Sequence, residues 1–253
     1  MSTFFAVENL TMRFGGLVAV DDLSFEMDEH EIFTIIGPNG AGKTTIFNMV
    51  SLIYPPTTGR IVFQDREITG MRADAVAALG IGRTFQNIEL FEHATVLQNL
   101  LIGCHAHVKA NFIAEMLRLP SVREQELALR RQVEEVIDFL ELQSVRDSAV
   151  GGLPYGVRKV VELARALCTR PKLLLLDEPS SGLNVEETDD MAFWITDIRD
   201  ELGVSVLMVE HDMSLVSRVS DRVLAVNQGA RLAMGSAAQV QADPQVIAAY
   251  LGD

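Results

Sequence analysis

The chain has 253 residues, of which 48% are hydrophobic, and it carries a formal net charge of −14 with a pI near 4.8. This acidity excludes nucleic-acid binding through a basic face and docking on anionic lipid by charge alone. There is no N-terminal signal pattern, and no apolar run approaches the ~18–20 residues of a membrane span. Cys104 and Cys168 are widely separated and lack metal-ligand spacing, which favours free thiols. We therefore expect a cytoplasmic protein that reaches a membrane only through another protein.

The N-terminal region is predicted to be mostly β. Phe4 to Leu10, Ala19 to Met27 and Gly59 to Gln64 alternate or cluster apolar residues between turn signals. Residues 28–31 are polar and are predicted to form a hairpin turn that leads into the next strand.

The strongest motif follows that turn. Ile32 to Ile36 is a β-branched and aromatic run typical of a buried strand, and a helix is expected from Lys43. The glycines between them allow main-chain N–H groups to surround a phosphate, and the positive end of the helix faces the same anion. The motif matches the G-x-x-x-x-G-K-[ST] phosphate loop. Its predicted nucleotide-binding residues are Gly37, Pro38, Asn39, Gly40, Ala41, Gly42, Lys43, Thr44 and Thr45.

Two side chains of this loop have specific predicted roles. Lys43 can reach the β- and γ-phosphates, and the Thr44 hydroxyl can ligate Mg²⁺.

Phe14, just before Gly15 and Gly16, leaves two interpretations open. It is either a core aromatic of the first strand pair or a flat face on which adenine stacks.

The middle of the chain is predicted to be helical, with Ala73 to Leu79, Val96 to Cys104 and Val122 to Leu142 as its clearest helices. The last of these is amphipathic and is expected to be a charged surface helix. Its Glu and Arg residues face one way, and the apolar residues on its other face are Leu127, Val133, Val136, Ile137 and Leu140. Farther on, Gly151 to Lys159 forms a Gly-Pro-Gly turn that is expected to lead into a helix from Val160 to Cys168. Such a turn is a second potential anion site, although many helices begin this way.

A second strong pattern is the run of four leucines from Leu173 to Leu176, which is typical of a strand buried on both faces of a parallel sheet. Asp177 and Glu178 follow at its carboxyl end, where open α/β sheets bind ligands. Asp177 is expected to hold Mg²⁺, and Glu178 to act as general base on an attacking water. The bland interpretation, two solvated turn acids, is disfavoured by the phosphate loop.

Val204 to Val209 is another predicted buried strand, and it is followed by Glu210, His211 and Asp212. His211 and Gln86 both stand at carboxyl ends of predicted strands. A lone histidine is usually structural, but one beside a nucleotide site is well placed to contact the γ-phosphate, and we favour that role.

Taken together, these elements resemble the nucleotide-binding subunit of ATP-binding cassette (ABC) transporters from end to end. The resemblance implies a P-loop α/β core with a parallel sheet and an N-terminal antiparallel β subdomain, formed by residues 1–87 and 166–253. It also implies an inserted α-helical signature subdomain at 88–165. Head-to-tail dimers would bind two ATPs, each between one phosphate loop and the partner's signature loop, which here reads Leu153, Pro154, Tyr155, Gly156 and Val157.

The resemblance also assigns roles to single residues. Phe14 becomes the adenine platform, Gln86 the Mg²⁺ ligand and coupling sensor, and His211 the γ-phosphate switch. The helical subdomain would carry the docking groove for the membrane subunit, for which Asn87 to Phe91 and Phe112 to Leu119 are candidate lining segments.

A narrower likeness points to the LivG-type ATPases of branched-chain amino acid importers. It is carried by Arg13 to Leu17, Arg83 to Asn87, Asn227 to Gly229 and the ending Val246 to Gly252. In that subfamily the ATPase pairs with a LivF-type ATPase beneath two membrane-spanning permease subunits, which receive cargo from a periplasmic binding protein. Urea, amides or small aromatic acids remain open as cargo.

Two competing functions belong to different classes. The first is an ABC-type ATPase that acts away from the membrane, for which tandem cassettes, a long coiled-coil insertion or basic surfaces would be typical. This single acidic chain has none of these features. The second is a nucleotide-binding regulator that does not hydrolyse ATP, and the presence of Glu178, Gln86 and His211 argues against it.

Two departures from the family pattern matter. Pro154 replaces the serine of the usual Leu-Ser-Gly-Gly-Gln signature, and proline has neither a hydroxyl nor an N–H to donate. Loss of that charge-assisted hydrogen bond costs roughly 1.5–3 kcal/mol, whereas the remaining helix N-terminus contributes up to about 2 kcal/mol. We therefore predict a working but weakened signature. Asn184 stands where many relatives have Asp, so communication across the dimer is less certain at that position.

Overall fold

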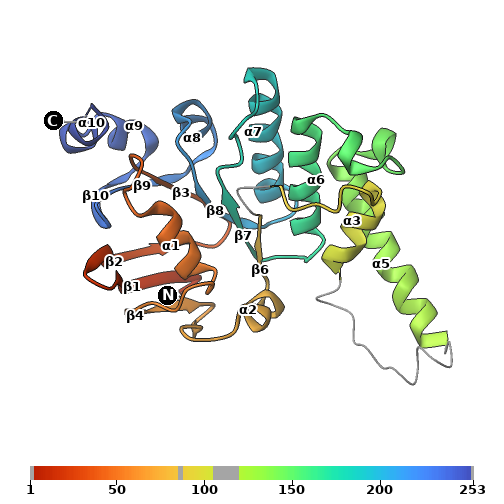
Figure 1. The fold of residues 1–253 in the computed structure, drawn as a ribbon, viewed down its shortest axis with the longest axis horizontal. Coiled ribbons are helices and arrows are strands. Elements are labelled where there is room, and N and C mark those ends of the chain that lie inside the picture. Colours follow the sequence, from red (N-terminus) through yellow and green to blue (C-terminus); the bar gives the residue numbers. More distant parts are fainter. Residues whose placement is uncertain (1–2, 85–87, 105–119, 252–253) are drawn as a thin grey trace. The chain divides into compact units, whose positions relative to one another are not determined.

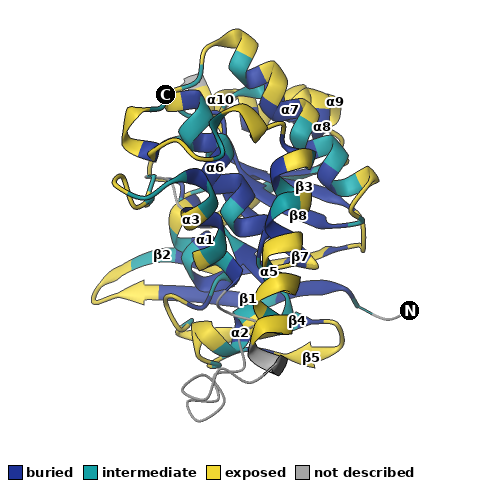
Figure 2. Cartoon of the chain, turned by 90° about the vertical axis from the view of Figure 1, so that its right-hand side faces the viewer, coloured by how far each residue is buried: buried dark blue, intermediate teal, exposed yellow. Residues whose placement is uncertain are grey.

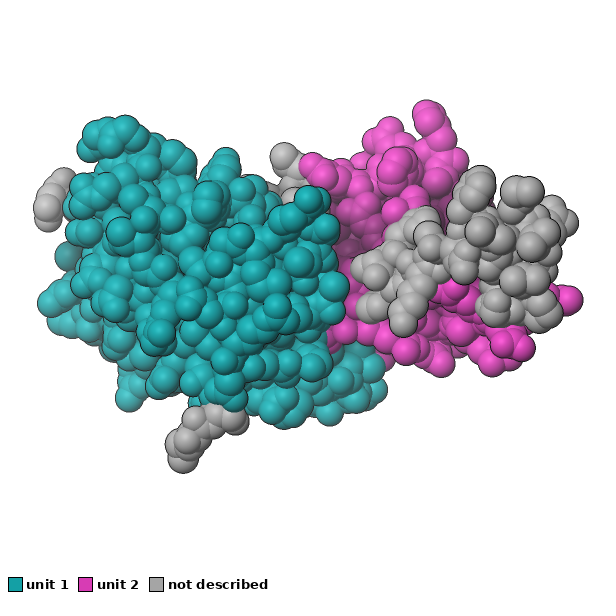
Figure 3. All heavy atoms as spheres, turned by 90° about the horizontal axis from the view of Figure 1, so that it is seen from below, with its two compact units in different colours: residues 1–86, 172–253 teal, residues 87–171 magenta. Residues whose placement is uncertain are grey.

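The computed structural model describes residues 3–84, 88–104 and 120–251 (Figure 1). No helix within these ranges is long and apolar enough to cross a membrane. The chain forms two compact units, one made of residues 1–86 and 172–253 and the other of residues 87–171 (Figure 3). The second unit thus starts one residue before, and ends several residues after, the 88–165 segment expected from the sequence.

The first unit begins with an antiparallel sheet in the order β2-β1-β4-β5. Its strands are β1 (Phe5–Phe14), β2 (Leu17–Met27), β4 (Thr58–Phe63) and β5 (Arg66–Glu67). The hairpin predicted at residues 28–31 is wrong, because β2 pairs with β1 in this sheet, while β3 belongs to a second sheet. All five residues of β3 are buried, so the strand fits the centre of a parallel sheet rather than an exposed hairpin.

The second sheet has six strands in the order β10-β9-β3-β8-β7-β6. They are β3 (Ile32–Ile36), β6 (Ile81–Arg83), β7 (Leu173–Asp177), β8 (Ser205–Val209), β9 (Arg222–Asn227) and β10 (Ala230–Gly235). Strand β10 runs antiparallel to β9, and the other strand pairs of this sheet are parallel. Every residue of β3, β7 and β8 is buried (Figure 2), which explains their uninterrupted apolar sequences.

Helices cover both faces of this parallel sheet. Helix α1 (Lys43–Val50) lies between the two sheets, and its Ile46, Phe47 and Val50 are completely buried in the core cluster that both sheets share. On the opposite face, a second cluster joins Ile36 to α8 (Met213–Val219), α9 (Ala237–Gln241) and α10 (Pro244–Leu251). This unit also contains α2 (Ala73–Leu79) and α7 (Val185–Asp200).

The second unit contains α3 (Val96–Gly103), α5 (Pro120–Phe139), α6 (Tyr155–Leu167) and two short 3₁₀ turns, Gln143–Val145 and Val150–Gly152. Helix α6 starts at Tyr155, five residues earlier than predicted, because Pro154 supplies an extended N-cap with φ −53°. The apolar side chains expected to share one face of the helix predicted at Val122 to Leu142 differ in burial: Val133, Ile137 and Leu140 are buried. Leu127 is exposed, since no described side chain of α5 before Gln132 is buried. The helix predicted at Phe112 to Leu119 lies outside the described residues.

Candidate nucleotide-binding site

The glycine-rich loop lies between the carboxyl end of β3 and the start of α1. Gly42 has φ +98°, and a Cβ on it would lie 2.6 Å from the main-chain oxygen of Ala19. A Cβ on Gly37 would lie 2.3 Å from the main-chain oxygen of Val226. Both positions therefore require glycine, and the loop can follow a path that turns its N–H groups inward.

Lys43, the first residue of α1, is buried within this loop. Its ammonium group donates to the main-chain oxygens of Gly37 at 2.6 Å and Pro38 at 3.0 Å. Burial lowers the pKa of Lys43, and the nearby charge of Glu178 opposes that shift. The Lys43 side chain is thus held against the main chain of the phosphate loop, and the Glu178 carboxylate is close enough to influence its charge.

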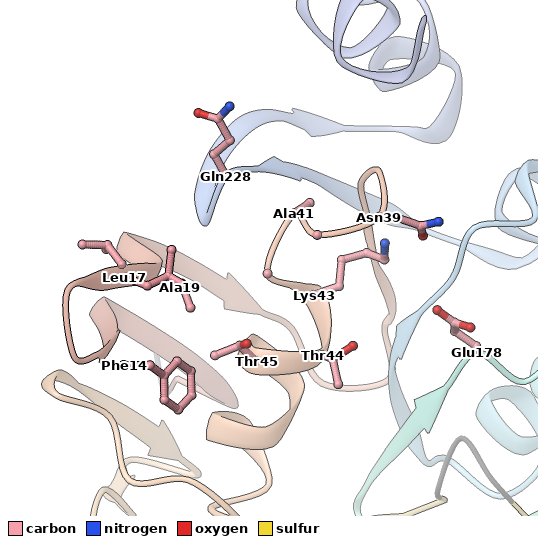
Figure 4. Close-up of a pocket in the computed structure, with 13 residues that line it drawn as sticks. Phe14, Leu17, Ala19, Asn39, Ala41, Lys43, Thr44, Thr45, Glu178 and Gln228 are labelled. Atoms are coloured by element: carbon pink, nitrogen blue, oxygen red, sulfur yellow. The ribbon is translucent and has the colours of Figure 1, made fainter. Parts of the chain in front are cut away.

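A cavity of about 790 Å³ opens beside the loop (Figure 4). Its described lining residues are Phe14, Leu17, Val18, Ala19, Asn39, Gly40, Ala41, Gly42, Lys43, Thr44, Thr45, Glu178 and Gln228. Phe14 is 46% exposed and meets Tyr54 edge to face, with 5.9 Å between the ring centroids. It is therefore not a core aromatic, and its ring is available to a ligand. Figure 4 shows Phe14 and Glu178 on opposite sides of the loop.

The structure adds lining residues that sequence patterns do not single out as site residues: Leu17, Val18, Ala19 and Gln228. Gln228 belongs to the turn between β9 and β10, and the next residue anchors that turn to the phosphate loop. The Gly229 N–H donates to the Ala41 oxygen at 2.9 Å, and the Gly229 oxygen accepts from the Asp21 N–H at 2.9 Å. The Asn227-Gln228-Gly229 turn pattern is visible in the sequence, but its pairing with Ala41 is not.

Two acids stand at the carboxyl end of β7. Asp177 is only 3% exposed and pairs with the Arg83 guanidinium at 3.1 Å. Arg83 also donates to the Ser51 hydroxyl and lies 4.9 Å from the centre of the Phe47 ring. Burial lowers the pKa of Arg83 against the raising effect of Asp177. Sequence patterns do not identify Arg83 as part of this site, because its partner lies more than ninety residues away.

Glu178 has a left-handed φ of +48°, which is uncommon for a residue with a side chain. His211, which follows β8 by two residues, lies close to it. The His211 Nδ1 is 3.8 Å from a Glu178 carboxylate oxygen and 3.8 Å from a Glu210 carboxylate oxygen. The structure thus brings Glu178 and His211 together. Gln86 lies outside the described residues.

The predicted signature residues belong to the second unit. Pro154 caps α6, Tyr155 is exposed, and the buried Gly156 lies in the first turn of the helix. None of the residues from Leu153 to Val157 is among the described residues that line the cavity. Within the described parts of the chain there is also no group of three or more His, Cys, Asp or Glu side chains that would hold a metal ion by itself.

A phosphate loop between a parallel strand and a helix, with acids at the end of a strand in the same sheet, defines a P-loop nucleotide-binding protein. The family model for ABC transporters matches residues 20–181, and the model described as "Branched-chain amino acid ATP-binding cassette transporter" matches residues 230–253. The chain belongs to the ABC transporter family, as its ATP-binding component. The family and the fold class predicted from the sequence are confirmed.

Similar proteins agree with this assignment over nearly the whole chain. The chain is 42% identical to the high-affinity branched-chain amino acid transport ATP-binding protein BraF of Pseudomonas aeruginosa, covering 98% of this chain and 97% of BraF. It is 39% identical to LivG of Escherichia coli K12, with the same coverage. Among solved structures, a nucleotide-free ATP-binding cassette from an ABC transporter superposes with a TM-score of 0.87 at 28% identity, and both chains are covered completely.

Proposed function

We propose that this chain is the ATP-hydrolysing subunit of an importer for branched-chain amino acids. The observation that supports it most is the 39–42% identity, over 97–98% of both chains, to proteins named for branched-chain amino acid transport. The match of residues 230–253 to a family model described by the same transport class agrees with it. The fold supplies a nucleotide site of the right kind, and the relatives supply the cargo class.

The residues around the cavity fit Mg·ATP. Main-chain N–H groups of the loop and Lys43 would bind the phosphates, and the exposed Phe14 ring would stack on adenine. Mg²⁺ prefers oxygen ligands, and the Thr44 hydroxyl lines the cavity. The other expected ligands are Gln86 and Asp177, which directly precedes Glu178 and whose buried carboxylate pairs with Arg83. When bound, the ion neutralises charge on the phosphates.

The mechanism assigned to this chain's residues is hydrolysis by a directed water. Glu178 accepts a proton from the attacking water as general base. His211, whose ring is within 3.8 Å of the same carboxylate, contacts the γ-phosphate and orients the water. Lys43 donates to the phosphate oxygens that gain charge as the bond breaks.

The proposed partners are a second ATPase subunit, two permease subunits and, indirectly, a periplasmic binding protein. The second ATPase is either another copy or a LivF-type chain, and it would contribute its signature loop to the site. The permease would dock near Phe91, whose side chain is 58% exposed. The main chain of Phe91 is pinned by the buried Asn99, whose side chain accepts from its N–H at 2.8 Å and donates to its oxygen at 3.1 Å. Docked on the permease, the chain would lie at the cytoplasmic face of the membrane.

Reconstitution tests the proposal directly. The chain is co-expressed with its permease subunits and partner ATPase, and the complex is placed in vesicles with the binding protein and ATP. Uptake of labelled leucine that stops in Lys43→Ala is the expected result. ATP-driven uptake of urea, amides or aromatic acids without leucine would overturn the cargo class, and undiminished ATP turnover in Lys43→Ala would overturn the site.

The proline of the signature loop gives a second test within the same complex. Because Pro154 lacks both donors of the usual serine, Pro154→Ser should raise ATP-driven dimerisation, by about 10- to 150-fold if the full ~1.5–3 kcal/mol of that hydrogen bond is restored. Gel filtration with the hydrolysis-deficient Glu178→Gln background measures dimer formation. No gain would contradict the proposed weakness of this signature.

A further inference from the structure

Glu210 is a completely buried carboxylate directly after β8, with 0% of its surface exposed. A charge removed from water is strongly unfavourable unless hydrogen bonds or an opposite charge compensate it. Four hydrogen bonds from neighbouring loops provide that compensation. Glu210 lies at the carboxyl edge of the sheet, one residue before His211, so its buried carboxylate is well placed to influence the proposed site.

The two oxygens of this carboxylate serve two different loops. One oxygen accepts from the Ser180 N–H at 2.9 Å and from the Ser180 hydroxyl at 2.6 Å. The other accepts from the N–H groups of His211 at 2.7 Å and Asp212 at 3.0 Å. Glu210 therefore ties the loop that follows β7 to the loop that follows β8, with one oxygen for each loop.

Both loops carry a residue of the proposed hydrolytic machinery. Glu178 lies two residues before Ser180, and the His211 ring is 3.8 Å from both the Glu178 and the Glu210 carboxylates. We propose that Glu210 is a positioning residue for ATP hydrolysis: its carboxylate joins the two loops so that Glu178 and His211 meet at one point. This inference rests on the proposed roles of Glu178 and His211 in hydrolysis.

The chemistry of a carboxylate suits this role better than that of any neutral side chain. Hydrogen bonds to an ionised acceptor are shorter and roughly twice as strong as neutral ones. An apolar residue would leave three main-chain N–H groups and a hydroxyl without this acceptor. Glutamine has the same shape, but its amide nitrogen cannot accept, so one of the two loops would lose both of its bonds.

The test compares Glu210→Gln with Glu31→Gln in the full-length chain. Glu31 is a buried glutamate that precedes β3, at the opposite edge of the same sheet, and it pairs with Arg222. The matched change therefore controls for the loss of a buried carboxylate away from the proposed hydrolytic residues. We expect kcat for ATP to fall about 10- to 100-fold in Glu210→Gln, because displacement of a catalytic group by ~1 Å has effects of that size. KM should stay within about twofold, and Glu31→Gln should lower the melting temperature with kcat unchanged.

A spectroscopic measurement separates positioning from general destabilisation. The ring resonances of His211, one of five histidines in the chain, can be assigned by loss of signal in His211→Ala. These resonances should shift in Glu210→Gln and stay in place in Glu31→Gln. Equal loss of kcat in both variants, or unchanged His211 resonances in Glu210→Gln, would overturn the inference.

Two further variants keep the test decisive. If Glu178→Gln retains full turnover, the proposed hydrolytic site itself is wrong; if it loses turnover while Glu210→Gln does not, only the role of Glu210 is wrong. Should Glu210→Gln fail to fold, Ser180→Ala removes just the hydroxyl bond at 2.6 Å. In that variant kcat should fall several-fold with KM maintained, and an unchanged kcat would overturn the inference.

Discussion

Two buried glutamates stand at opposite edges of the parallel sheet and are stabilised in different ways. At the carboxyl edge, Glu210 is held by N–H groups and a hydroxyl of two loops. At the amino edge, Glu31 accepts from the Asp28 N–H at 2.8 Å and from Arg222 at 2.7 Å. Arg222 in turn lies 5.5 Å from the centre of the Phe33 ring.

The two buried carboxylates have different partners, which indicates a different structural role at each edge of the sheet. At the amino edge a cation neutralises the acid, and the hydrogen bond to Glu31 raises the pKa of Arg222. At the carboxyl edge the acid takes up N–H groups of the loops that follow β7 and β8, so loop geometry depends on it. Since ligands of α/β sheets bind at the carboxyl edge, that edge uses its buried charge to shape a site, and the amino edge uses it to join strands.

The largest expected effect is at the carboxyl edge. Glu178→Gln should lower ATP turnover about 10²- to 10⁴-fold, because it removes the proposed general base while leaving the fold intact. Single-turnover phosphate release measures the loss, and the melting temperature serves as control. A decrease smaller than tenfold would indicate that the base lies elsewhere.

The amino edge should respond in stability instead. Arg222→Ala leaves the Glu31 carboxylate buried without its cation, which costs about 3 kcal/mol of unfolding free energy. Urea denaturation measures this loss. The turnover of Arg222→Ala per folded molecule should match that of the unmodified chain. A loss of kcat in this variant would contradict the assignment of a purely stabilising role to the amino edge.

A third substitution tests how tightly the carboxyl edge is fitted around the phosphate loop. Gly229 has φ +79°, and a Cβ on it would lie 2.5 Å from the Ala19 oxygen, so Gly229→Ala should cost about 1–3 kcal/mol and weaken ATP binding. Gly70, with φ +74° and open space around it, is the matched control. Fluorescent-nucleotide titration and thermal melts measure both effects. Equal losses in both variants would show that backbone strain alone, and not the fit to Ala19, matters.

The smallest effect is expected for an ion pair outside both edges. Arg60 and Glu8 pair across β4 and β1 with well-exposed side chains. Solvent screening leaves such pairs with little influence on stability, so Arg60→Ala should not measurably change the melting temperature or turnover. A clear drop in the melting temperature of Arg60→Ala would mean that the loss of any ion pair destabilises the protein. Burial would then not explain the larger effect expected for Arg222→Ala.

The parts of this site that can be predicted from the sequence lie within single short segments. The phosphate loop and the Asp177–Glu178 pair each combine a residue pattern with a strand before it, and the structure places both at the carboxyl edge of the sheet. Gly229 reaches the phosphate loop from nearly two hundred positions away, and local patterns carry no such information. The same holds for the four donors to Glu210, which two separate loops bring to one carboxylate.

Errors in the predicted elements have a similar cause. Polar residues between two strands usually join neighbours, which is why the sequence predicts a hairpin at 28–31. The two strands instead enter different sheets, since β3 pairs with β8 and β9. Helical periodicity puts Leu127 on the same face as Val133 and Ile137, but it does not reveal how far along that face another element packs. Val133 and Ile137 are buried, whereas Leu127 is 45% exposed.

The central place of β3 has a consequence for how the protein is made. This strand leaves the ribosome early, but both of its partners, β8 and β9, are encoded in the last fifth of the chain. The amide that braces Ala41 comes later still, from Gly229. The strand pairs of β3 and the hydrogen bond to Ala41 can therefore form only when translation is nearly complete. Closing contacts so distant in sequence makes for slow folding and a prolonged need for protection from aggregation.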